Sequence, residues 1–325
     1  MIIYTPPGPA ENIPIIDISD SFSTTLEKRR AVAWEIHRAA RDTGFFYIKN
    51  HGMSAKDLNG ILDLARQFFA LPMAEKMALN IANSQNMRGY EPMALQALDT
   101  GSPPDLKESF MSARELGPEH PFVRDKIPYE GANQWPTSLP QFRQGVLRYN
   151  ERISDLGRHL CRSIALSLDL PEDYFSEGVA EPSCTVRLLH YPPHPTNAEA
   201  NQLGAGAHTD WGLITLLLQD DVGGLEVRNA AGKWLRATPI EGTFVVNLAD
   251  LVPRITNGLY HSTMHRVLNN LSGRDRYSVA TFFNPSYMSR FDLVPTCRPE
   301  NFVPAPWTFG EHIQDMFNRT YGKGT

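Results

Sequence analysis

The chain has 325 residues, of which 42% are hydrophobic and 21% are charged, and its formal net charge is −5. A chain of this length can bury a large core, and the composition is ordinary for a folded protein without low-complexity tracts. No block of Lys and Arg could follow a phosphate backbone, which excludes nucleic acid and an anionic membrane as expected partners.

The N-terminus and the cysteines favour a cytoplasmic location. Residues 1–7 show no basic region followed by an apolar run, and no apolar stretch approaches membrane-spanning length. Cys161, Cys184 and Cys297 are odd in number and far apart, which is typical of reduced thiols and not of a disulfide framework or a thiolate zinc site. Both a monomer and a homodimer are compatible with the sequence.

The first part of the chain predicts alternating strands and helices. The predicted elements are a strand over 13–17, a helix from Thr24 to a stop at Gly44, a buried strand over 45–48, and a helix from Ser54 to a stop at Pro72. Thr24 and Glu27 have the spacing of a capping box, and Ser54 is a good N-cap residue.

Residues 83–136 are rich in Pro, Gly and Asn and show no sustained period, so they are interpreted as long loops that shape a substrate pocket. A long helix is then expected from Ser138 and Gln141. Its apolar residues recur at steps of three and four from Phe142 to Ile164, which predicts a helix packed against a sheet.

From Cys184 onward the sequence changes to short β-prone runs separated by turns. Strands are predicted near 184–191, 213–219, 224–228, 233–237, 243–248, 263–269 and 277–283. A hairpin turn is expected at 229–232. Many short strands without intervening helices favour a sandwich or barrel, and a double-stranded β-helix (jelly roll) often places a metal in its mouth.

The expected fold class is therefore mixed α and β, with a mostly β jelly-roll core flanked by helices. We expect residues 1–325 to form a single catalytic unit. Its predicted parts are a supporting N-terminal region with substrate loops (1–135), a long spine helix (136–170), a jelly-roll core with the metal site (180–290), and a C-terminal tail and helix (291–325).

The triplet 208–210 contains a candidate metal site. On an extended strand, His208 and Asp210 would point to the same face and could reach one ion. His261 and His265 have the same strand parity, so spacing alone leaves both open as the third ligand, and His159, His190 and His194 also compete. Two His and one carboxylate leave coordination positions open, which is typical of non-haem Fe(II) and oxygen chemistry. The competing interpretation is a surface turn pair.

A candidate anion site follows on the last predicted strand, where Arg276, Ser278, Ala280 and Phe282 share one face. An inward-facing Arg in a barrel is costly unless an anion pairs with it, and its guanidinium can bind a carboxylate through two parallel hydrogen bonds. An internal Asp or Glu is the simpler partner. The neighbouring metal motif favours an anionic cosubstrate.

Several segments together resemble the Fe(II)/2-oxoglutarate dioxygenases of the isopenicillin N synthase-like superfamily. The matching segments are 44–52, 88–90, 187–193, 206–212, 247–250, 256–258, 261–267 and 275–278, and they cover nearly the whole chain in order. The resemblance selects His265 over His261 as the third iron ligand.

The resemblance also implies roles for individual residues. His208, Asp210 and His265 would bind Fe(II), and Arg276 and Ser278 would hold the distal carboxylate of 2-oxoglutarate. The hydroxyl of Tyr191 would help to hold that carboxylate or the substrate, and Phe282 would line the substrate pocket. Many plant members have Asn where this chain has Leu189, so a cosubstrate contact found there is not expected.

The implied reaction couples O2 and the oxidative decarboxylation of 2-oxoglutarate to succinate with the oxidation of a C–H bond in a small-molecule substrate. Hydroxylation is the expected outcome, and desaturation, ring closure and ring expansion are related ones. Residues expected to face the substrate are Arg88, Tyr90, Met93, Trp211 and Phe282. Residues 195–206 are interpreted as a flexible lid.

Three other functions fit parts of the pattern. An iron oxidase of the isopenicillin N synthase type would use O2 without 2-oxoglutarate. A cupin-like hydrolase or isomerase would use zinc or manganese, but it would leave Arg276 and Ser278 without a purpose. A non-catalytic sensor would need no complete ligand triad.

Overall fold

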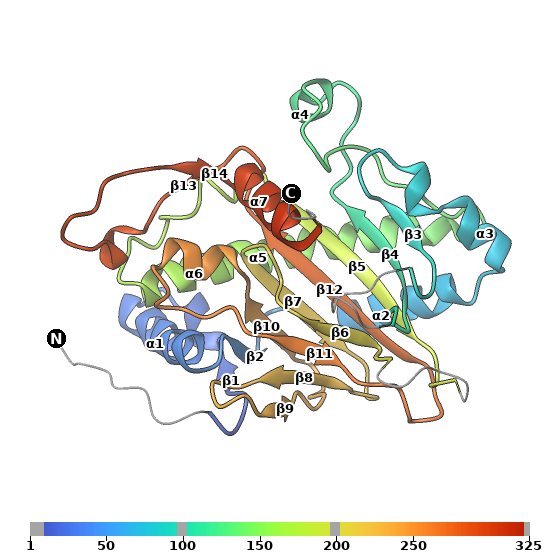
Figure 1. Cartoon of the computed structure of the whole chain (residues 1–325), viewed down its shortest axis with the longest axis horizontal. Coiled ribbons are helices and arrows are strands. Elements are labelled where there is room, and N and C mark those ends of the chain that lie inside the picture. Colours follow the sequence, from blue (N-terminus) through green and yellow to red (C-terminus); the bar gives the residue numbers. More distant parts are fainter. Residues whose placement is uncertain (1–9, 96–102, 196–201, 322–325) are drawn as a thin grey trace.

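The computed structural model describes residues 10–95, 103–195 and 202–321 and contains two facing sheets (Figure 1). The larger sheet consists, in spatial order, of β1 (Ile15–Asp17), β2 (Phe45–Lys49), β10 (Phe244–Leu248), β7 (Ile214–Gln219), β12 (Arg276–Asn284), β5 (Ser183–Tyr191), β4 (Glu108–Ala113) and β3 (Gly89–Glu91). The smaller sheet consists of β6 (Ala205–His208), β11 (His265–Val267), β8 (Leu225–Arg228) and β9 (Trp234–Arg236).

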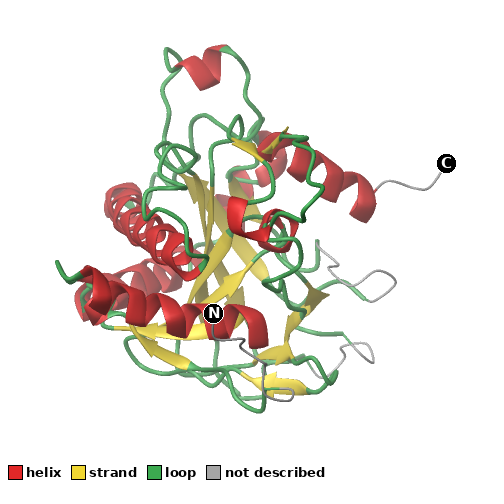
Figure 2. Cartoon of the chain, turned by 90° about the vertical axis from the view of Figure 1, so that its left-hand side faces the viewer, coloured by secondary structure: helices red, strands yellow, loops and turns green. Residues whose placement is uncertain are grey.

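Helices cover the outer face of the larger sheet, and Figure 2 shows the long helices gathered on that side. The α-helices are α1 (Leu26–Asp42), α2 (Ala55–Phe69), α3 (Met73–Ala78), α4 (Pro121–Arg124), α5 (Pro140–Ser167), α6 (Leu251–Ile255) and α7 (Phe309–Tyr321). Three 3-10 turns, η1 (Ser19–Phe22), η2 (Ile81–Asn83) and η3 (Pro295–Cys297), and a small pair of strands, β13 (Arg290–Phe291) and β14 (Trp307–Thr308), complete the described elements.

The spine helix α5 and its neighbour α2 form for the reasons that the sequence predicts. Ser54 caps α2 in a reciprocal capping box with Asp57. α5 is 28 residues long and buries an apolar stripe that begins at Phe142. The stripes of both helices join one large core with the outer face of the sheet.

The strand register decides which side chains face inward. Directly paired residues point to the same face, and β12 pairs β5 with Arg276 opposite Tyr191, Ser278 opposite Leu189, and Ala280 opposite Arg187. Leu189, Tyr191 and Ala280 belong to a second core cluster, which also contains Leu225, Val227 and Val267 of the smaller sheet. The space between the sheets is therefore a separate layer, and the jelly-roll prediction is confirmed.

Two helix starts differ from the prediction. The N-cap of α1 is Thr25, without a side-chain capping bond, so the predicted box of Thr24 and Glu27 does not form. α5 begins with Pro140 at its first position after Leu139. The hydroxyl of Ser138 instead bonds to Glu75. Proline is preorganised for a first helical turn, and this makes a capping side chain dispensable.

The interpretation of 83–136 as loops is wrong in part, because this range contains β3, β4 and α4. β4 pairs with β5 over all six of its residues. Its pattern is hidden in the sequence because Glu108, Ser109 and Ser112 are polar but buried. The predicted lid is also corrected: 196–201 lies outside the described residues, while Ala205 and Gly206 belong to β6.

The hairpin predicted at 229–232 is present between β8 and β9, where the Gly232 backbone N–H donates to the Asn229 carbonyl at 2.8 Å. Among residues 10–95, 103–195 and 202–321, no helix has both the length and the apolar character needed to cross a membrane.

Candidate active site

Two histidines face each other across adjacent strands of the smaller sheet. His208 ends β6, His265 begins β11, and the two residues are direct partners in the register. Nε2 of each ring lies 3.8 Å from Oδ1 of Asp210. One ligand atom from each of the three residues lies within 4.8 Å of the others. Two nitrogens and one oxygen at these separations can contact a single ion.

Hydrogen bonds fix which atoms point inward. Nδ1 of His208 donates to the Gly206 carbonyl at 2.8 Å, and Nδ1 of His265 donates to the Thr263 carbonyl at 3.2 Å. Both Nε2 atoms therefore present lone pairs to the centre.

Hydrogen bonds from two side chains also fix the orientation of the Asp210 carboxylate. Its Oδ2 accepts hydrogen bonds from the Thr215 hydroxyl at 2.6 Å and the Asn247 amide at 2.8 Å. Those two bonds use one carboxylate oxygen and leave Oδ1 directed at the histidines.

Burial and neighbouring charges set the protonation of this cluster. Burial is the main reason that the pKa of His208 falls to about 3, and the nearby His265 lowers it further. Burial alone would raise the pKa of Asp210, but His265, His208 and the two hydrogen bonds hold that pKa below its usual value. A neutral imidazole and an ionised carboxylate are the forms that bind metals.

The prediction that His208 and Asp210 share one strand is wrong in detail. β6 ends at His208, and Asp210 lies in the following turn. The turn is fixed because the Asp250 backbone N–H donates to the Asp210 carbonyl at 2.8 Å, while the Asn284 side chain accepts from the Leu213 backbone at 2.9 Å. A turn that is held by two hydrogen bonds, and not an extended strand, therefore brings Asp210 next to His208.

Arg276 is the most unusual buried side chain near this cluster, with 1% of its surface exposed. It donates to the Ser278 hydroxyl at 3.3 Å and to Oε1 of Gln219 at 3.1 Å, and its guanidinium lies 4.5 Å from the centre of the Tyr191 ring. Its Nε is buried without a hydrogen-bond partner in the part of the chain that the structure describes.

These partners are all neutral, so the structure does not support the internal ion pair considered from the sequence. A buried guanidinium without an anion is energetically costly. The arrangement fits an anionic ligand that completes it.

The metal cluster and Phe282 line one cavity between the two sheets. Tyr191 contributes to its wall as well, from the strand next to Arg276. Trp211 directly follows Asp210 but is not part of this lining, and its carbonyl accepts a hydrogen bond from His312 of α7 at 2.7 Å.

Two of the predicted substrate residues lie elsewhere. Tyr90 is fully buried in the outer core, where its hydroxyl donates to Glu108 at 2.5 Å. Arg88 is also buried and donates to the Tyr129 carbonyl at 2.6 Å. Their assignment to the substrate is corrected, because neither residue lines the cavity and β3, which contains Tyr90, is the edge strand of the larger sheet. Met93 is half-buried in a turn after β3 and does not line the cavity either.

The sequence interpretation missed two cationic residues in the lining, Lys107 and Arg187. Arg187 could have been found, because it lies four residues before Tyr191 and therefore faces the same way along β5. Lys107 immediately precedes β4, in a range where the sequence predicts only loops. The apolar lining residue Phe45 packs its ring edge-on against His265, with 5.3 Å between ring centroids.

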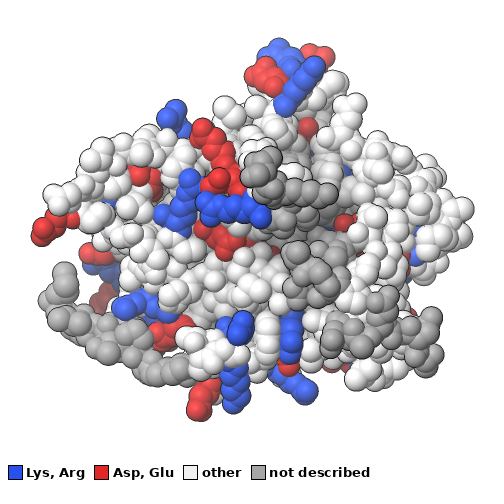
Figure 3. All heavy atoms as spheres, viewed as in Figure 1, with Lys and Arg blue, Asp and Glu red and all other residues white. Residues whose placement is uncertain are grey.

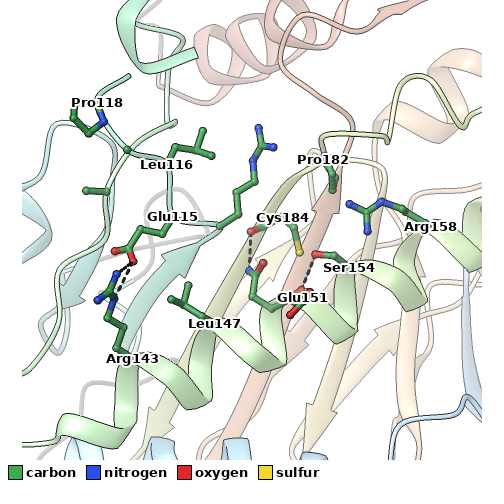
Figure 4. Close-up of a pocket in the computed structure, with 14 residues that line it drawn as sticks. Glu115, Leu116, Pro118, Arg143, Leu147, Glu151, Ser154, Arg158, Pro182 and Cys184 are labelled. Carbon is green, nitrogen blue, oxygen red and sulfur yellow. Dashed lines mark hydrogen bonds and ion pairs between the residues drawn. The ribbon is translucent and has the colours of Figure 1, made fainter. Parts of the chain in front are cut away.

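A second, more open hollow of about 740 Å³ lies between α5 and the segment after β4 (Figure 4). Its three arginines have acidic partners: Arg143 bonds to Glu115 at 2.6 Å, Arg158 bonds to Asp155, and Arg114 lies 3.5 Å from Glu181. None of the three candidate metal ligands lines it. Its size therefore does not mark it as the reactive site.

Comparison with known proteins agrees with the geometry. A family model described as the 2OG-Fe(II) oxygenase superfamily matches residues 182–285, and one described as the N-terminal region of non-haem dioxygenase in morphine synthesis matches residues 13–138. The chain is 36% identical over 319 residues to the 2-oxoglutarate-Fe(II) type oxidoreductase hxnY of Emericella nidulans, with 95% of this chain and 90% of that protein covered. The chain belongs to the Fe(II)/2-oxoglutarate-dependent dioxygenases.

Two further relatives extend the comparison across this dioxygenase family. Homoarginine-6-hydroxylase 2-ODD-C23 of Glycine max is 37% identical, with 93% of this chain and 95% of that protein covered. The crystal structure of a full-length Neurospora crassa protein in complex with alpha-KG (2-oxoglutarate) and thymine has a TM-score of 0.82 and 29% identity, with 95% of this chain and 97% of that chain covered. This dioxygenase thus uses Fe(II), 2-oxoglutarate and O2 to oxidise a small molecule.

Proposed function

We propose that His208, Asp210 and His265 hold the Fe(II) of this dioxygenase, and that Arg276 and Ser278 hold the distal carboxylate of 2-oxoglutarate. The observation that carries the proposal is the buried guanidinium of Arg276, which has only neutral partners and lies beside the wall of the cavity that the three metal-binding side chains line. The ring of Tyr191 packs against that guanidinium and lines the same cavity. Its hydroxyl is proposed to help hold the carboxylate or the substrate.

When bound, iron supplies a centre at which O2 and the 2-oxo acid react and yield the oxidant for a substrate C–H bond. The chain's own residues orient the reactants and exclude water. Phe45, Leu217 and Val245 give the cavity apolar walls. Thr215 and Asn247 keep the Asp210 carboxylate in one orientation. Rigid placement of this kind lowers the entropic cost of bringing the reactants together.

We propose hydroxylation of a small organic metabolite as the reaction of this enzyme. The relative in Glycine max is named as a hydroxylase, which supports this outcome over desaturation or ring chemistry. The Neurospora crassa complex contains thymine, a small planar molecule. Phe282 would then contact the substrate, because it lines the cavity from the same face of β12 as Arg276.

The remaining expectations from the sequence stay proposals. We propose a single catalytic unit in the cytoplasm, either monomeric or homodimeric, and free thiols at Cys161, Cys184 and Cys297 support a reducing compartment. Figure 3 shows basic and acidic side chains close to one another over much of one face. Among the ion pairs of the chain, Asp315 pairs with both Arg254 and Arg319. This mixed surface supports the absence of a nucleic-acid partner.

The proposal is tested by incubating the Fe(II)-loaded enzyme with candidate metabolites and measuring O2 uptake and succinate release, with and without 2-oxoglutarate. We expect succinate and the oxidised product to form together, and only when 2-oxoglutarate is present. Product formation without 2-oxoglutarate would indicate the oxidase alternative. Product formation without oxygen, in the zinc-loaded protein, would indicate the hydrolase or isomerase.

A further inference from the structure

Lys107 and Arg187 form a second cationic group in the iron cavity, separate from Arg276. Arg187 is opposite Ala280 in the register, whereas Tyr191 is opposite Arg276. Four residues along a strand span about 13 Å. A 2-oxoglutarate molecule anchored at Arg276 and directed to the metal therefore does not account for Arg187.

Each cation pairs with an acidic side chain, which is the buried Asp105 for Lys107 and the partly buried Glu91 for Arg187. Nζ of Lys107 pairs with Oδ2 of Asp105, whose Oδ1 accepts the Gly206 backbone N–H at 2.8 Å. Nη2 of Arg187 pairs with Oε2 of Glu91, and its Nε donates to the Ser109 hydroxyl at 2.9 Å. These contacts fix the direction of both cationic groups.

The cations face the cavity and the acids do not. Lys107 and Arg187 belong to the cavity lining, whereas Asp105 and Glu91 are absent from it. The part of the wall that Lys107 and Arg187 form is therefore positive, and the one carboxylate in the lining, Asp210, is the proposed metal ligand. Burial and, to a smaller extent, the charge of Arg187 together lower the pKa of Lys107 to about 8, against the opposing effect of Asp105. An anion bound between them would relieve this repulsion.

We propose that Lys107 and Arg187 bind an acidic group, a carboxylate, on the primary substrate, whose apolar body lies against Leu189 and Phe282. This inference rests on the proposed function, because it assigns the second ligand of the same cavity. Leu189 and Phe282 line the cavity from neighbouring strands. A charge-assisted bond to a fixed guanidinium gives both affinity and orientation.

The test compares carboxylic acids with their primary amides, which have nearly the same shape but no charge. The probes are acetate derivatives with phenyl, indolyl, pyridyl and cyclohexyl bodies. Each acid and its amide are titrated anaerobically into the enzyme loaded with Fe(II) and 2-oxoglutarate, and binding is followed by calorimetry. We expect at least one acid to bind about tenfold or more tightly than its amide.

Variants then test whether Lys107 and Arg187 cause the preference for the acid over its amide. Lys107→Met and Arg187→Met should each reduce the ratio of acid to amide affinity toward one, and Arg187→Lys should retain part of it. Arg274→Met is the matched control, since Arg274 is exposed and pairs with Asp221 on the surface. If a Met variant does not fold, the comparison in the unmodified enzyme and in Arg187→Lys still decides the question.

Two results would overturn the inference. One is a set of acids in which none binds more tightly than its amide, and the other is a preference that survives in both Met variants. Either result leaves the proposed function standing if 2-oxoglutarate still binds and yields succinate. A failure of 2-oxoglutarate itself to bind would instead contradict the assignment of Arg276.

Discussion

Arg276 is the residue proposed to bind the distal carboxylate of the cosubstrate. Its planar donors and nearly complete burial match a carboxylate, and its neighbours Ser278 and Gln219 are neutral. Arg276→Gln removes the charge and keeps a hydrogen-bonding group. We expect the KM for 2-oxoglutarate to rise by about 30-fold or more, since a charge-assisted hydrogen bond contributes about 2 kcal/mol.

Succinate release at varied 2-oxoglutarate concentration measures this effect. Arg274→Gln serves as its control, because this neighbouring arginine is exposed on the surface and pairs there with Asp221. An unchanged KM in Arg276→Gln would show that the cosubstrate carboxylate is bound elsewhere.

The hydroxyl of Thr215 supports one of the proposed metal ligands. It donates to Oδ2 of Asp210 at 2.6 Å and shares that oxygen with Asn247. Thr215→Val keeps the shape and removes the bond, so the carboxylate loses part of its orientation. We expect Fe(II) affinity to fall by about 10-fold.

An anaerobic Fe(II) titration monitored by calorimetry measures the change. Thr281→Val is the matched control, since Thr281 is a buried threonine of the same sheet that does not line the cavity. Its neighbours on β12, Ala280 and Phe282, do line it. Equal losses in the two variants would mean that the Thr215 bond has no specific role.

At the scale of elements, α5 approaches the sheet closely because it has a glycine at the contact. A Cβ at Gly157 would lie 2.4 Å from the Phe283 ring of β12. Phe283 is fully buried and cannot move without disturbing the core. Gly157→Ala should therefore lower the free energy of unfolding by about 1–3 kcal/mol, although alanine is the better helix former.

The matched control is Gly60→Ala in α2, where no atom lies within 4 Å of the added Cβ. The same substitution there should raise the free energy of unfolding by about 0.5–1 kcal/mol. Chemical denaturation of both variants checks the opposite signs. A stabilised Gly157→Ala protein would contradict the close packing of α5 on β12.

Elements with a strong period could be predicted from the sequence, whereas elements held by distant polar partners could not. α5 and α2 show their apolar stripes directly. β4 does not, because Glu108 is buried against Lys76, which lies far away in the sequence. Because β4 is not predicted from the sequence, Lys107, which directly precedes it, is not predicted to line the cavity either.

The candidate site follows the same rule. Residue type, residue order and the family resemblance together predict His208, Asp210, His265 and Arg276 as site residues. The turn that brings Asp210 to the histidines depends on the backbone bond from Asp250 and on the side-chain bond from Asn247. Both residues lie far from Asp210 in the sequence, so no local pattern predicts the turn. Arg88 and Tyr90 are predicted to face the substrate because of the motif they share, but both are buried away from the cavity, and Tyr90 belongs to the outer core.

For the whole molecule, a partly buried histidine links the N-terminal segment to the spine helix. Nε2 of His159 lies 2.7 Å from the Ser21 hydroxyl, and its ring stacks on Phe22 at 3.9 Å. Burial, and to a smaller extent Arg162, lowers its pKa to about 4. Between this value and the ordinary 6.5, the unfolded chain binds a proton that the folded protein does not bind.

Stability should therefore fall as the pH decreases from about 6.5 to about 4, and His159 contributes about 2 kcal/mol of this loss, because its ring is only partly buried. Gln does not titrate, so the His159→Gln protein should lose about 2 kcal/mol less stability over the same pH range. Urea unfolding at several pH values measures the difference, with exposed His261→Gln as control. A loss in His159→Gln equal to that of the unmodified protein would rule out this role.

The choice between His265 and His261 as iron ligand gives the most direct test of the proposed metal site. Fe(II) is titrated anaerobically in the presence of 2-oxoglutarate, and the visible charge-transfer absorption of the complex is followed. We expect the unmodified protein and His261→Ala to bind one Fe(II) per chain and develop this absorption, and His265→Ala to lose both. Binding that is retained in His265→Ala and lost in His261→Ala would contradict the proposed metal site.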